Sequence, residues 1–409
     1  MKTELIERIL KETAYVRMGG SAEEKRTADY LCELCRGLGA EAYLESFEVD
    51  MSRMQAATLT VNGQSIPCKG YLLAGSGSVE APIYYLTSDD RYSLSQCRGK
   101  IVLFDGYLGY WKYRDLLENG AVGFISYDGS VNYADRDIDQ RELRSYVSKG
   151  EKLLGVNVNA KDAVAIVNGG CGNAVITLEQ EETKGVSHNV VVDLKGEIEE
   201  TVLFTAHYDS TSLSQGAYDN MSGCIGLLGM IEQFLHTPHR HSLRFVFCGS
   251  EERGLLGSKA YCAAHEEELK SIALVINLDM IGSIMGRFIA CATCEMKLVH
   301  YISYMGDELG FQVHAYQDVY SSDSTPFADR GVPAVSFARA AGREVATIHN
   351  SYDTAALLKT EQLQGDITFI AAFAERMANA RICPVSREIP ESIKEKLDEY
   401  LCRKRKSRT

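Results

Sequence analysis

The residues best suited to chemistry in this sequence are histidines and carboxylates in short motifs between Val202 and Asp353. Carboxylate oxygens mixed with imidazole nitrogens, with no cysteine at the matching positions, are typical ligands of catalytic rather than structural zinc. The sequence therefore predicts one or two Zn²⁺ ions held for catalysis. The residues are His207 in VLFTAHYDS, Asp219 in GAYDNMSG, Glu251 and Glu252 in FVFCGSEERGLLGS, Asp279 in INLDMIGS, and His349 in TIHNSYDT.

The residue types also suggest which residue would take each role in a metal-assisted hydrolysis. Two ions need a bridging carboxylate, and Asp219 suits this role because it lies in a turn just before an apolar helix. Glu251 and Glu252 are neighbours at a strand end, so their side chains point in different directions. One can then bind metal while the other accepts a proton from water and passes it to the leaving amine. Asp209, two residues after His207, is placed to orient that imidazole through its second nitrogen.

Strands must bring these residues together, because the motifs lie far apart in the sequence. Buried-strand patterns precede most of them, at 202–206, 243–248, 272–278 and, more loosely, 332–338. In an open α/β sheet, ligands collect at the carboxyl ends of the strands. The alternation of strand and helix patterns predicts an α/β fold, a three-layer sandwich around a mixed, largely parallel sheet.

Taken in order, the motifs AHYDS, GAYDNMSG, GSEERGLLGS, NLDMIG and HNSYD resemble a known family. It is the co-catalytic zinc peptidase family of bacterial and vacuolar aminopeptidases and glutamate carboxypeptidases. The resemblance implies two Zn²⁺ per chain and Glu251 as the general base. It implies these ligand sets: His207, Asp219 and Asp279 for one ion, and Asp219, Glu252 and His349 for the other.

Two details of the resemblance can be checked in a structure. Relatives use a cis peptide bond after the bridging aspartate, which implies a cis bond between Asp219 and Asn220. The family's Ser-Asp-His-x-Pro-Phe stretch reads SSDSTPF here, with Ser324 in place of the histidine. That histidine is not a metal ligand, so the departure concerns substrate preference.

The N-terminal part of the chain predicts two helices and then a change of pattern. One helix is expected over 3–17, and Ser21 with Glu24 matches a capping box that begins a second. From about residue 68, short apolar runs such as 101–104 and 163–167 read as strands between Gly, Asn and Asp turns. CRGKIVLFDG followed by YWKYRDLLENGAVGFISYD resembles the protease-associated domain often inserted in these peptidases.

The domain organisation follows from these patterns. We expect a peptidase domain formed by 1–65 and 186–383, with a small, β-rich, protease-associated-like domain inserted over 66–185. A charged helix and tail occupy 384–409.

Composition excludes several classes of partner. The net charge of −13 over 409 residues argues against nucleic acid, because a phosphate backbone would be repelled. No run of 18 apolar residues occurs, so no membrane span is expected. The N-terminus has an amphipathic rather than an apolar signal pattern, and the 12 cysteines then indicate reduced thiols in the cytoplasm.

The function expected from these observations is a metal-dependent exopeptidase that removes N-terminal residues from peptides, an aminopeptidase. Asp323 and Tyr320 are the candidates for binding the substrate near its free amine. A glutamate-carboxypeptidase-like hydrolase is the main alternative, since Arg339 and Arg343 lie near His349 in sequence.

Two less favoured alternatives belong to other classes. A single-zinc acyltransferase of the glutaminyl cyclase kind needs a pocket lined with tryptophan. The one tryptophan of this sequence, Trp111, lies in the expected inserted domain. An inactive binding relative would be expected to have lost ligands, and every ligand of the motifs is present.

Overall fold

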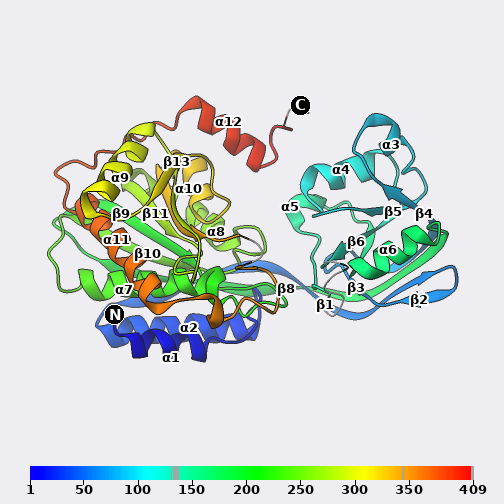
Figure 1. The fold of residues 1–409 in the computed structure, drawn as a ribbon, viewed down its shortest axis with the longest axis horizontal. Helices are drawn as coiled ribbons and strands as arrows, with labels where there is room; N and C mark the ends of the chain where they lie inside the picture. Colours follow the sequence, from blue (N-terminus) through cyan, green and yellow to red (C-terminus); the bar gives the residue numbers. More distant parts are fainter. Residues whose placement is uncertain (130, 132–137, 343–344, 407–409) are drawn as a thin grey trace. The chain divides into compact units, whose positions relative to one another are not determined.

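The computed structural model describes residues 1–129, 131, 138–342 and 345–406. The chain divides into two compact units, Met1–Val49 with Val186–Thr409, and Asp50–Gly185 (Figure 1). The second unit begins before residue 66, where the sequence placed the inserted domain. The reason is that β1 (Ala42–Val61) runs on into this unit and pairs there with β2 (Gln64–Ile66) as an antiparallel hairpin.

The first unit is built around a mixed sheet with the strand order β13-β12-β14-β11-β9-β10-β8. The strands β10, β9, β11 and β14 form a parallel centre, whereas β8 and β12 are antiparallel to their neighbours β10 and β14. The predicted mixed, largely parallel sheet is therefore confirmed. The strands are β8 Asn173–Leu194, β9 Ile198–His207, β10 His241–Cys248, β11 Ile272–Leu278, β12 Arg287–Thr293, β13 His314–Gln317 and β14 Ala334–Ala340.

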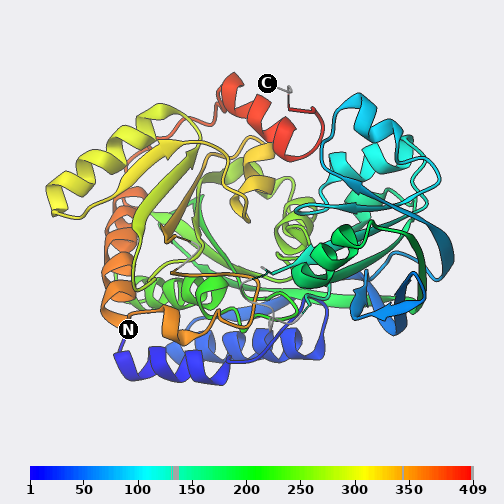
Figure 2. The ribbon, with the colours of Figure 1, turned by 45° about the vertical axis from the view of Figure 1, so that its right-hand side comes forward.

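Helices cover both faces of this sheet, which makes the three layers visible in Figures 1 and 2. Alternation along β9 shows why both faces are covered, because Phe204 packs into one apolar core and Leu203 into the other. The first core is shared with α1 (Thr3–Glu12), α2 (Ala22–Leu38), α7 (Ser222–Phe234), α9 (Met296–Leu309) and α11 (Thr360–Ala378). The second is shared with α8 (Leu256–Ala264), η3 (Glu268–Ser271), α10 (Ser324–Asp329) and α12 (Glu391–Tyr400).

The first helix is shorter than the sequence suggested, since α1 ends at Glu12 rather than at residue 17. Arg17 is fully buried and donates hydrogen bonds to backbone carbonyls, so this segment leaves the helix and turns into the protein. Ser21 caps α2 by accepting from Glu24 N at 3.1 Å, as predicted. The reciprocal half of the capping box is absent, because Ser21 N donates to the carbonyl of Met18 instead.

The second unit has its own apolar core around a smaller set of strands. One expected strand, 163–167, is a helix: α6 spans Ala160–Asn168 and is capped by Asn159, whose side chain accepts from Lys161 N at 2.9 Å. The assignment of this unit as a protease-associated domain remains a prediction. Its other elements are β3 Cys68–Gly70, β4 Gly77–Leu86, α3 Arg91–Ser95, β5 Ile101–Phe104, α4 Tyr110–Glu118, β6 Gly123–Asp128, α5 Ser145–Ser148 and β7 Leu154–Asn159.

Among the helices that the structure describes, none combines the length and apolar character needed to cross a membrane.

Candidate metal centre

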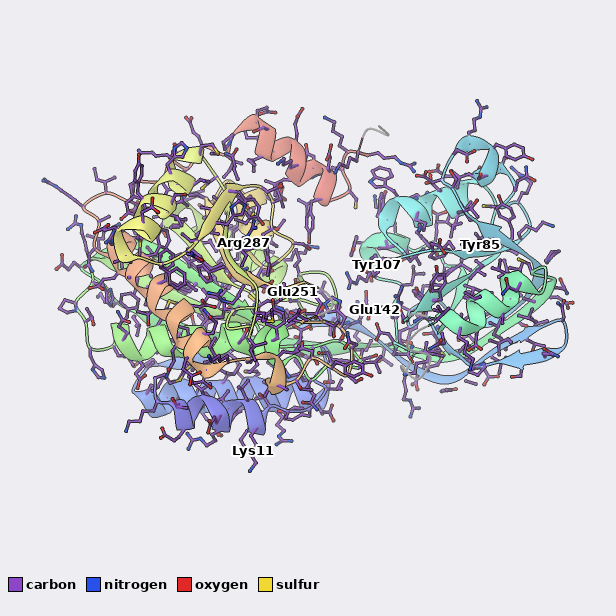
Figure 3. The ribbon with its side chains drawn as sticks, viewed as in Figure 1. Lys11, Tyr85, Tyr107, Glu142, Glu251 and Arg287 are labelled. Atoms are coloured by element: carbon purple, nitrogen blue, oxygen red, sulfur yellow. The ribbon has the colours of Figure 1, made fainter. Side chains whose placement is uncertain are left out.

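The predicted ligands lie at the carboxyl edge of the parallel strands. His207 is the last residue of β9 and pairs in register with Cys248, the last residue of β10. Asp279 follows β11 directly, and the Glu251–Glu252 pair follows β10 after a two-residue turn. Figure 3 labels Glu251 at this edge. Parallel strands that end together therefore bring distant motifs to one place.

Asp219 lies between two imidazoles. Its Oδ1 is 3.0 Å from His207 Nε2, and its Oδ2 is 3.2 Å from His349 Nε2. Glu252 Oε2 lies 3.2 Å from the same His349 nitrogen, and Asp279 Oδ1 lies 3.7 Å from His207 Nε2. The ligand atoms form two overlapping groups, each with its members within 4.8 Å of one another, and Asp219 belongs to both.

The donor set fits divalent zinc. Each group contains one imidazole nitrogen and two carboxylates, the mixture found in catalytic zinc sites. Asp279 Oδ1 is buried and accepts no hydrogen bond from any residue that the structure describes, which leaves a lone pair directed at the site. Burial raises the pKa of Glu252 above its usual value, as expected for a carboxylate that lacks sufficient positive charge nearby. A bound cation would supply that charge.

The pKa values of the two histidines are raised, so their protonated, positively charged forms are favoured. Burial alone would lower the pKa of His349, but Glu252 and Asp219 raise it to about 12. Burial likewise opposes the charge on His207, whose pKa is nevertheless raised well above its usual value by carboxylates that include Glu251. The cluster as a whole is therefore rich in negative charge that favours a cation.

Asp209 connects the two strand ends. Its Oδ1 accepts from Glu251 N at 2.9 Å, and its Oδ2 accepts from Glu252 N at 3.1 Å. The same Oδ1 lies 3.3 Å from His207 Nδ1, so the carboxylate also faces the imidazole that it was predicted to orient. Asp209 is fully buried. It thus lies beside the imidazole of His207 and also holds the backbone of the glutamate pair.

The turn that carries Glu251 has an unusual backbone. Ser250 has φ 54° and Leu255 has φ 61°, a left-handed conformation that side chains other than glycine seldom adopt. Such residues cost about 1–3 kcal/mol each and persist where the surroundings fix them. Burial raises the pKa of Glu251 well above its usual value; His207 lowers it, whereas Glu252 raises it. This is the direction that suits a general base working near neutral pH.

Asp219 sits in the turn Ala217–Met221 that precedes α7, and the Asp219–Asn220 peptide bond is cis, as the resemblance implied. Asp353 holds this turn, because its carboxylate accepts from Tyr218 N at 2.8 Å and from Asp219 N at 3.2 Å. The following turn η4 (Ala355–Leu357) is capped by Thr354.

A second supporting residue, Arg17, was missed entirely in the sequence. Its guanidinium is fully buried and donates to the backbone carbonyls of Tyr208, Gln215 and Gly216, the segment between His207 and Asp219. An arginine at the end of an amphipathic helix reads as a solvent-exposed residue. Only the glycine pair that follows it, at 19–20, hinted that the chain turns inward here.

The two candidate substrate residues differ in their surroundings. Tyr320 is partly buried, and burial, followed by the charge of Asp279, raises its pKa well above its usual value. Asp323 is fully buried, and its Oδ1 accepts from Ser258 Oγ at 2.6 Å. The sequence analysis made Asp323 a candidate for binding the substrate's free amine, whereas in the structure its side chain is shielded from solvent.

The arginine expected near His349 in the carboxypeptidase alternative is already engaged. Arg339 forms a buried ion pair with Asp366, in which Nε lies 2.9 Å from Oδ2. Its guanidinium also lies over the ring of Phe288, 5.4 Å from the ring centre. Arg343, the second arginine of that argument, lies outside the described residues.

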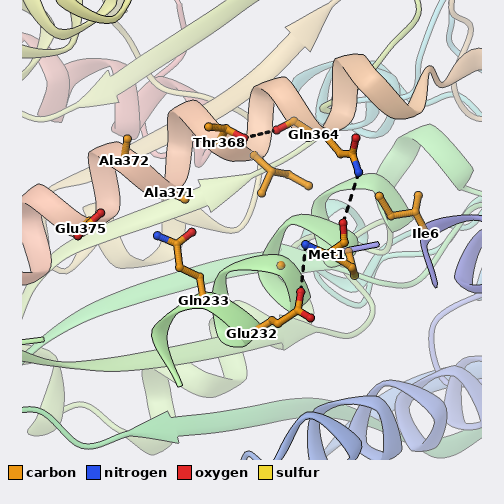
Figure 4. A pocket seen from close by; sticks show the side chains of 11 residues that line it. Met1, Ile6, Glu232, Gln233, Gln364, Thr368, Ala371, Ala372 and Glu375 are labelled. Atoms are coloured by element: carbon orange, nitrogen blue, oxygen red, sulfur yellow. Dashed lines mark hydrogen bonds and ion pairs between the residues drawn. The ribbon is translucent and has the colours of Figure 1, made fainter. Parts of the chain in front are cut away.

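The chamber shown in Figure 4 is a different feature of the first unit. It has a volume of about 670 Å³ between α7 and α11, and its lining includes Met1, Glu232 and Gln364. The amino group of Met1 lies 3.0 Å from Glu232 there. None of the predicted ligands lines it, so it is separate from the metal centre.

Comparison with known proteins finds similar peptidases. Residues 189–374 match the model of peptidase family M28. Among curated relatives, aminopeptidase YwaD of Bacillus subtilis (strain 168) is 26% identical over 358 residues, which cover 80% of this chain and 73% of that protein. The next curated relatives are longer, and the chain spans 55% of their length.

Solved structures share the fold. An aminopeptidase from Aneurinibacillus sp. strain AM-1 superimposes with a TM-score of 0.77 at 22% identity, covering 94% of this chain and 96% of that one. BSAP, a zinc aminopeptidase from Bacillus subtilis, gives a TM-score of 0.74 at 24% identity, covering 95% and 97%. Both likenesses confirm the open, mixed sheet with helices on both faces.

Proposed function

Because residues 189–374 of this chain match the model of peptidase family M28, we propose that the protein is a zinc-dependent aminopeptidase that removes N-terminal residues from peptides. The observation that carries the proposal is the position of Asp219. Its two oxygens face His207 and His349 separately, at 3.0 Å and 3.2 Å, which is the arrangement of a carboxylate shared by two ions. Each imidazole has a further carboxylate beside it, Asp279 or Glu252.

Zinc ions held by these residues would supply a Lewis acid that polarises a peptide carbonyl and lowers the pKa of water. Glu251 is the proposed general base. Its carboxylate accepts the proton of the attacking water and donates it to the nitrogen of the leaving amine. Asp209 maintains the position of this carboxylate by holding the N–H groups of Glu251 and Glu252.

The substrate end of the site is assigned to Tyr320 and Asp323. We propose that the Tyr320 hydroxyl donates a hydrogen bond to the substrate, since its high pKa keeps it protonated. Asp323 is buried and accepts a hydrogen bond from Ser258 Oγ, so we propose that it acts on the substrate indirectly rather than by direct contact. The acidic surroundings favour a substrate that presents a free ammonium group.

The alternatives are less well supported by particular residues. Carboxypeptidase action on acidic peptides needs a free arginine, and Arg339 is paired with Asp366. The glutaminyl cyclase alternative needs tryptophan at the metal centre, whereas Trp111 belongs to α4 of the other unit. An inactive relative would have lost ligands, whereas His207, Asp219, Glu252, Asp279 and His349 all lie together here.

A panel of substrates separates these functions. Zinc-loaded protein is expected to release the chromogenic amine from aminoacyl anilides with a free amino group and to leave N-acetylated analogues intact. Cleavage of N-acetylated peptides that end in glutamate, without cleavage of free aminoacyl anilides, would establish the carboxypeptidase alternative. Cyclisation of N-terminal glutamine would establish the acyltransferase.

The role of Glu251 is tested by Glu251→Gln, which preserves shape but removes the proton acceptor. We expect kcat to fall by at least about 100-fold, within the range for general acid–base catalysis, while zinc content stays unchanged. Normal turnover in the zinc-loaded variant would refute the assignment.

We also propose a cytoplasmic location. Every one of the 12 cysteines is a free thiol in the structure, which agrees with a reducing compartment. Cell fractionation tests this, and recovery of the protein with oxidised cysteines from a secreted fraction would contradict it.

A further inference from the structure

We propose that Glu24, in the N-terminal helix α2, is a positioning residue for the general base Glu251. The inference rests on the proposed function and adds to it a residue outside the segment 189–374 that matches the family model. Glu24 is fully buried and lies 226 positions before Ser250, the neighbour of Glu251. Its carboxylate is therefore brought to the metal centre by the tertiary fold alone.

Both oxygens of Glu24 accept hydrogen bonds from the backbone. Oε1 accepts from Ser250 N at 2.8 Å, and Oε2 accepts from Gly20 N at 2.6 Å. Oε1 also accepts from Ser250 Oγ at 3.1 Å and from Ser187 Oγ at 2.9 Å. The carboxylate thus connects the start of α2 to the turn after β10.

This turn needs such support because of its conformation. Ser250 has φ 54°, and a residue other than glycine holds this conformation only where contacts fix it. The neighbouring backbone is closely packed as well: a Cβ at Gly249 would lie 2.4 Å from the carbonyl oxygen of His188 and 2.9 Å from Glu24 Oε1. A small change at Glu24 is therefore transmitted to the position of Glu251.

Glu24 and Asp209 accept hydrogen bonds from different backbone N–H groups of the turn that carries Glu251. The N–H of Ser250 is held by Glu24, and the N–H groups of Glu251 and Glu252 are held by Asp209. Three consecutive backbone amides are thus fixed by two buried carboxylates that come from different parts of the chain. We infer that the direction of the Glu251 side chain depends on both carboxylates, although neither touches the substrate.

The variant Glu24→Gln tests this with little change in shape. A glutamine has one acceptor oxygen and one NH₂ group, so in either orientation it can accept from only one of Ser250 N and Gly20 N. If Ser250 N loses its acceptor, the turn carrying Glu251 is released. If Gly20 N loses it, the start of α2 shifts and carries residue 24 with it.

We expect kcat on an aminoacyl anilide to fall by about 10- to 100-fold, the range for residues that orient groups of a metal site, with KM changed less than about threefold. Zinc content, measured by mass spectrometry of the metal, should stay at the level of the unaltered protein. The matched comparison is Ser187→Ala, which removes one hydroxyl donor to Glu24 but leaves both backbone N–H contacts. Its kcat should stay within about threefold.

A second control separates positioning from general loss of stability. Thr27 lies on the same helix, and Thr27→Val removes partly buried hydrogen bonds to Tyr15 and to the carbonyl of Glu23. It should lower the melting temperature without lowering kcat. Glu24→Gln protein with normal kcat, or a fall in kcat matched by Thr27→Val at equal melting temperature, would overturn the inference. Failure of the proposed function would instead appear as inactive unaltered protein.

Discussion

Replacing Asp209 by asparagine removes one oxygen from a carboxylate whose two oxygens are both in use. Oδ1 accepts from Glu251 N at 2.9 Å and faces His207 Nδ1 at 3.3 Å, while Oδ2 accepts from Glu252 N at 3.1 Å. The NH₂ group of asparagine must replace one of these oxygens. This NH₂ group then faces either the N–H of Glu252 or both the N–H of Glu251 and the imidazole of His207. In either orientation, hydrogen-bond donors face one another without an acceptor.

The magnitude follows from the cost of an unsatisfied buried donor, about 1–3 kcal/mol. At 1.36 kcal/mol per factor of ten, that cost corresponds to a change of about 5- to 150-fold. Loss of partners behind a metal ligand typically reduces affinity or activity by about 10- to 100-fold. We therefore expect kcat/KM of Asp209→Asn to fall by about 10- to 100-fold, less than for loss of the base itself.

The assay is hydrolysis of an aminoacyl anilide by protein loaded with saturating zinc, with the metal content of each sample measured. The control is Asp193→Asn, the same change at a carboxylate that is 43% exposed and paired with Arg244. This control should retain normal kcat/KM. The reasoning would be refuted by Asp209→Asn protein whose kcat/KM and zinc content both stay within about twofold of the unaltered enzyme.

Three further predictions concern other contacts. Glu252→Gln should reduce zinc from about two ions to about one per chain in metal analysis, because an amide is a much poorer zinc ligand than a carboxylate; unchanged content would exclude Glu252 as a ligand. Arg339→Met should lower the free energy of unfolding in urea by about 3–5 kcal/mol, because it leaves the Asp366 carboxylate buried without its partner; a change below about 1 kcal/mol would contradict this. Burial opposes protonation of His265, but Glu268 and then Glu45 raise its pKa above the usual 6.5. The stability that protonated His265 contributes is therefore complete below about pH 6.5 and is lost as the pH rises through the folded pKa. His265→Gln should thus lower the melting temperature more at about pH 6 than at about pH 9. An equal effect at both pH values would contradict the argument.

The sequence alone was enough to predict the candidate metal ligands and the class of fold. Motifs such as AHYDS and NLDMIG place a polar residue directly after a run of apolar residues. Both parts of that signal are local: the apolar run forms a buried strand, and the residue after it must lie at the carboxyl edge of the sheet. In the structure His207 ends β9 and Asp279 follows β11, as this reasoning requires.

Short apolar runs carried less information. The run at 163–167 reads equally well as a strand or as part of a helix, because five residues are too few to distinguish the two periods. The structure makes it part of α6, whose N-cap Asn159 lies outside the run. The left-handed conformation of Ser250 was likewise invisible, because its cause lies in contacts with other segments.

Only the tertiary structure decided which buried charges support the ligands. Arg17, Glu24 and Asp353 each hold backbone groups of segments more than 130 positions away in the chain. In the sequence they look like ordinary surface residues near turns, because a charged residue is usually exposed. A backbone N–H or carbonyl can be contributed by any residue, so the partners of these side chains leave no pattern of residue types. Metal ligands are recognisable in a sequence because their chemistry demands particular side chains, whereas the residues that position them are defined by where the fold brings the backbone.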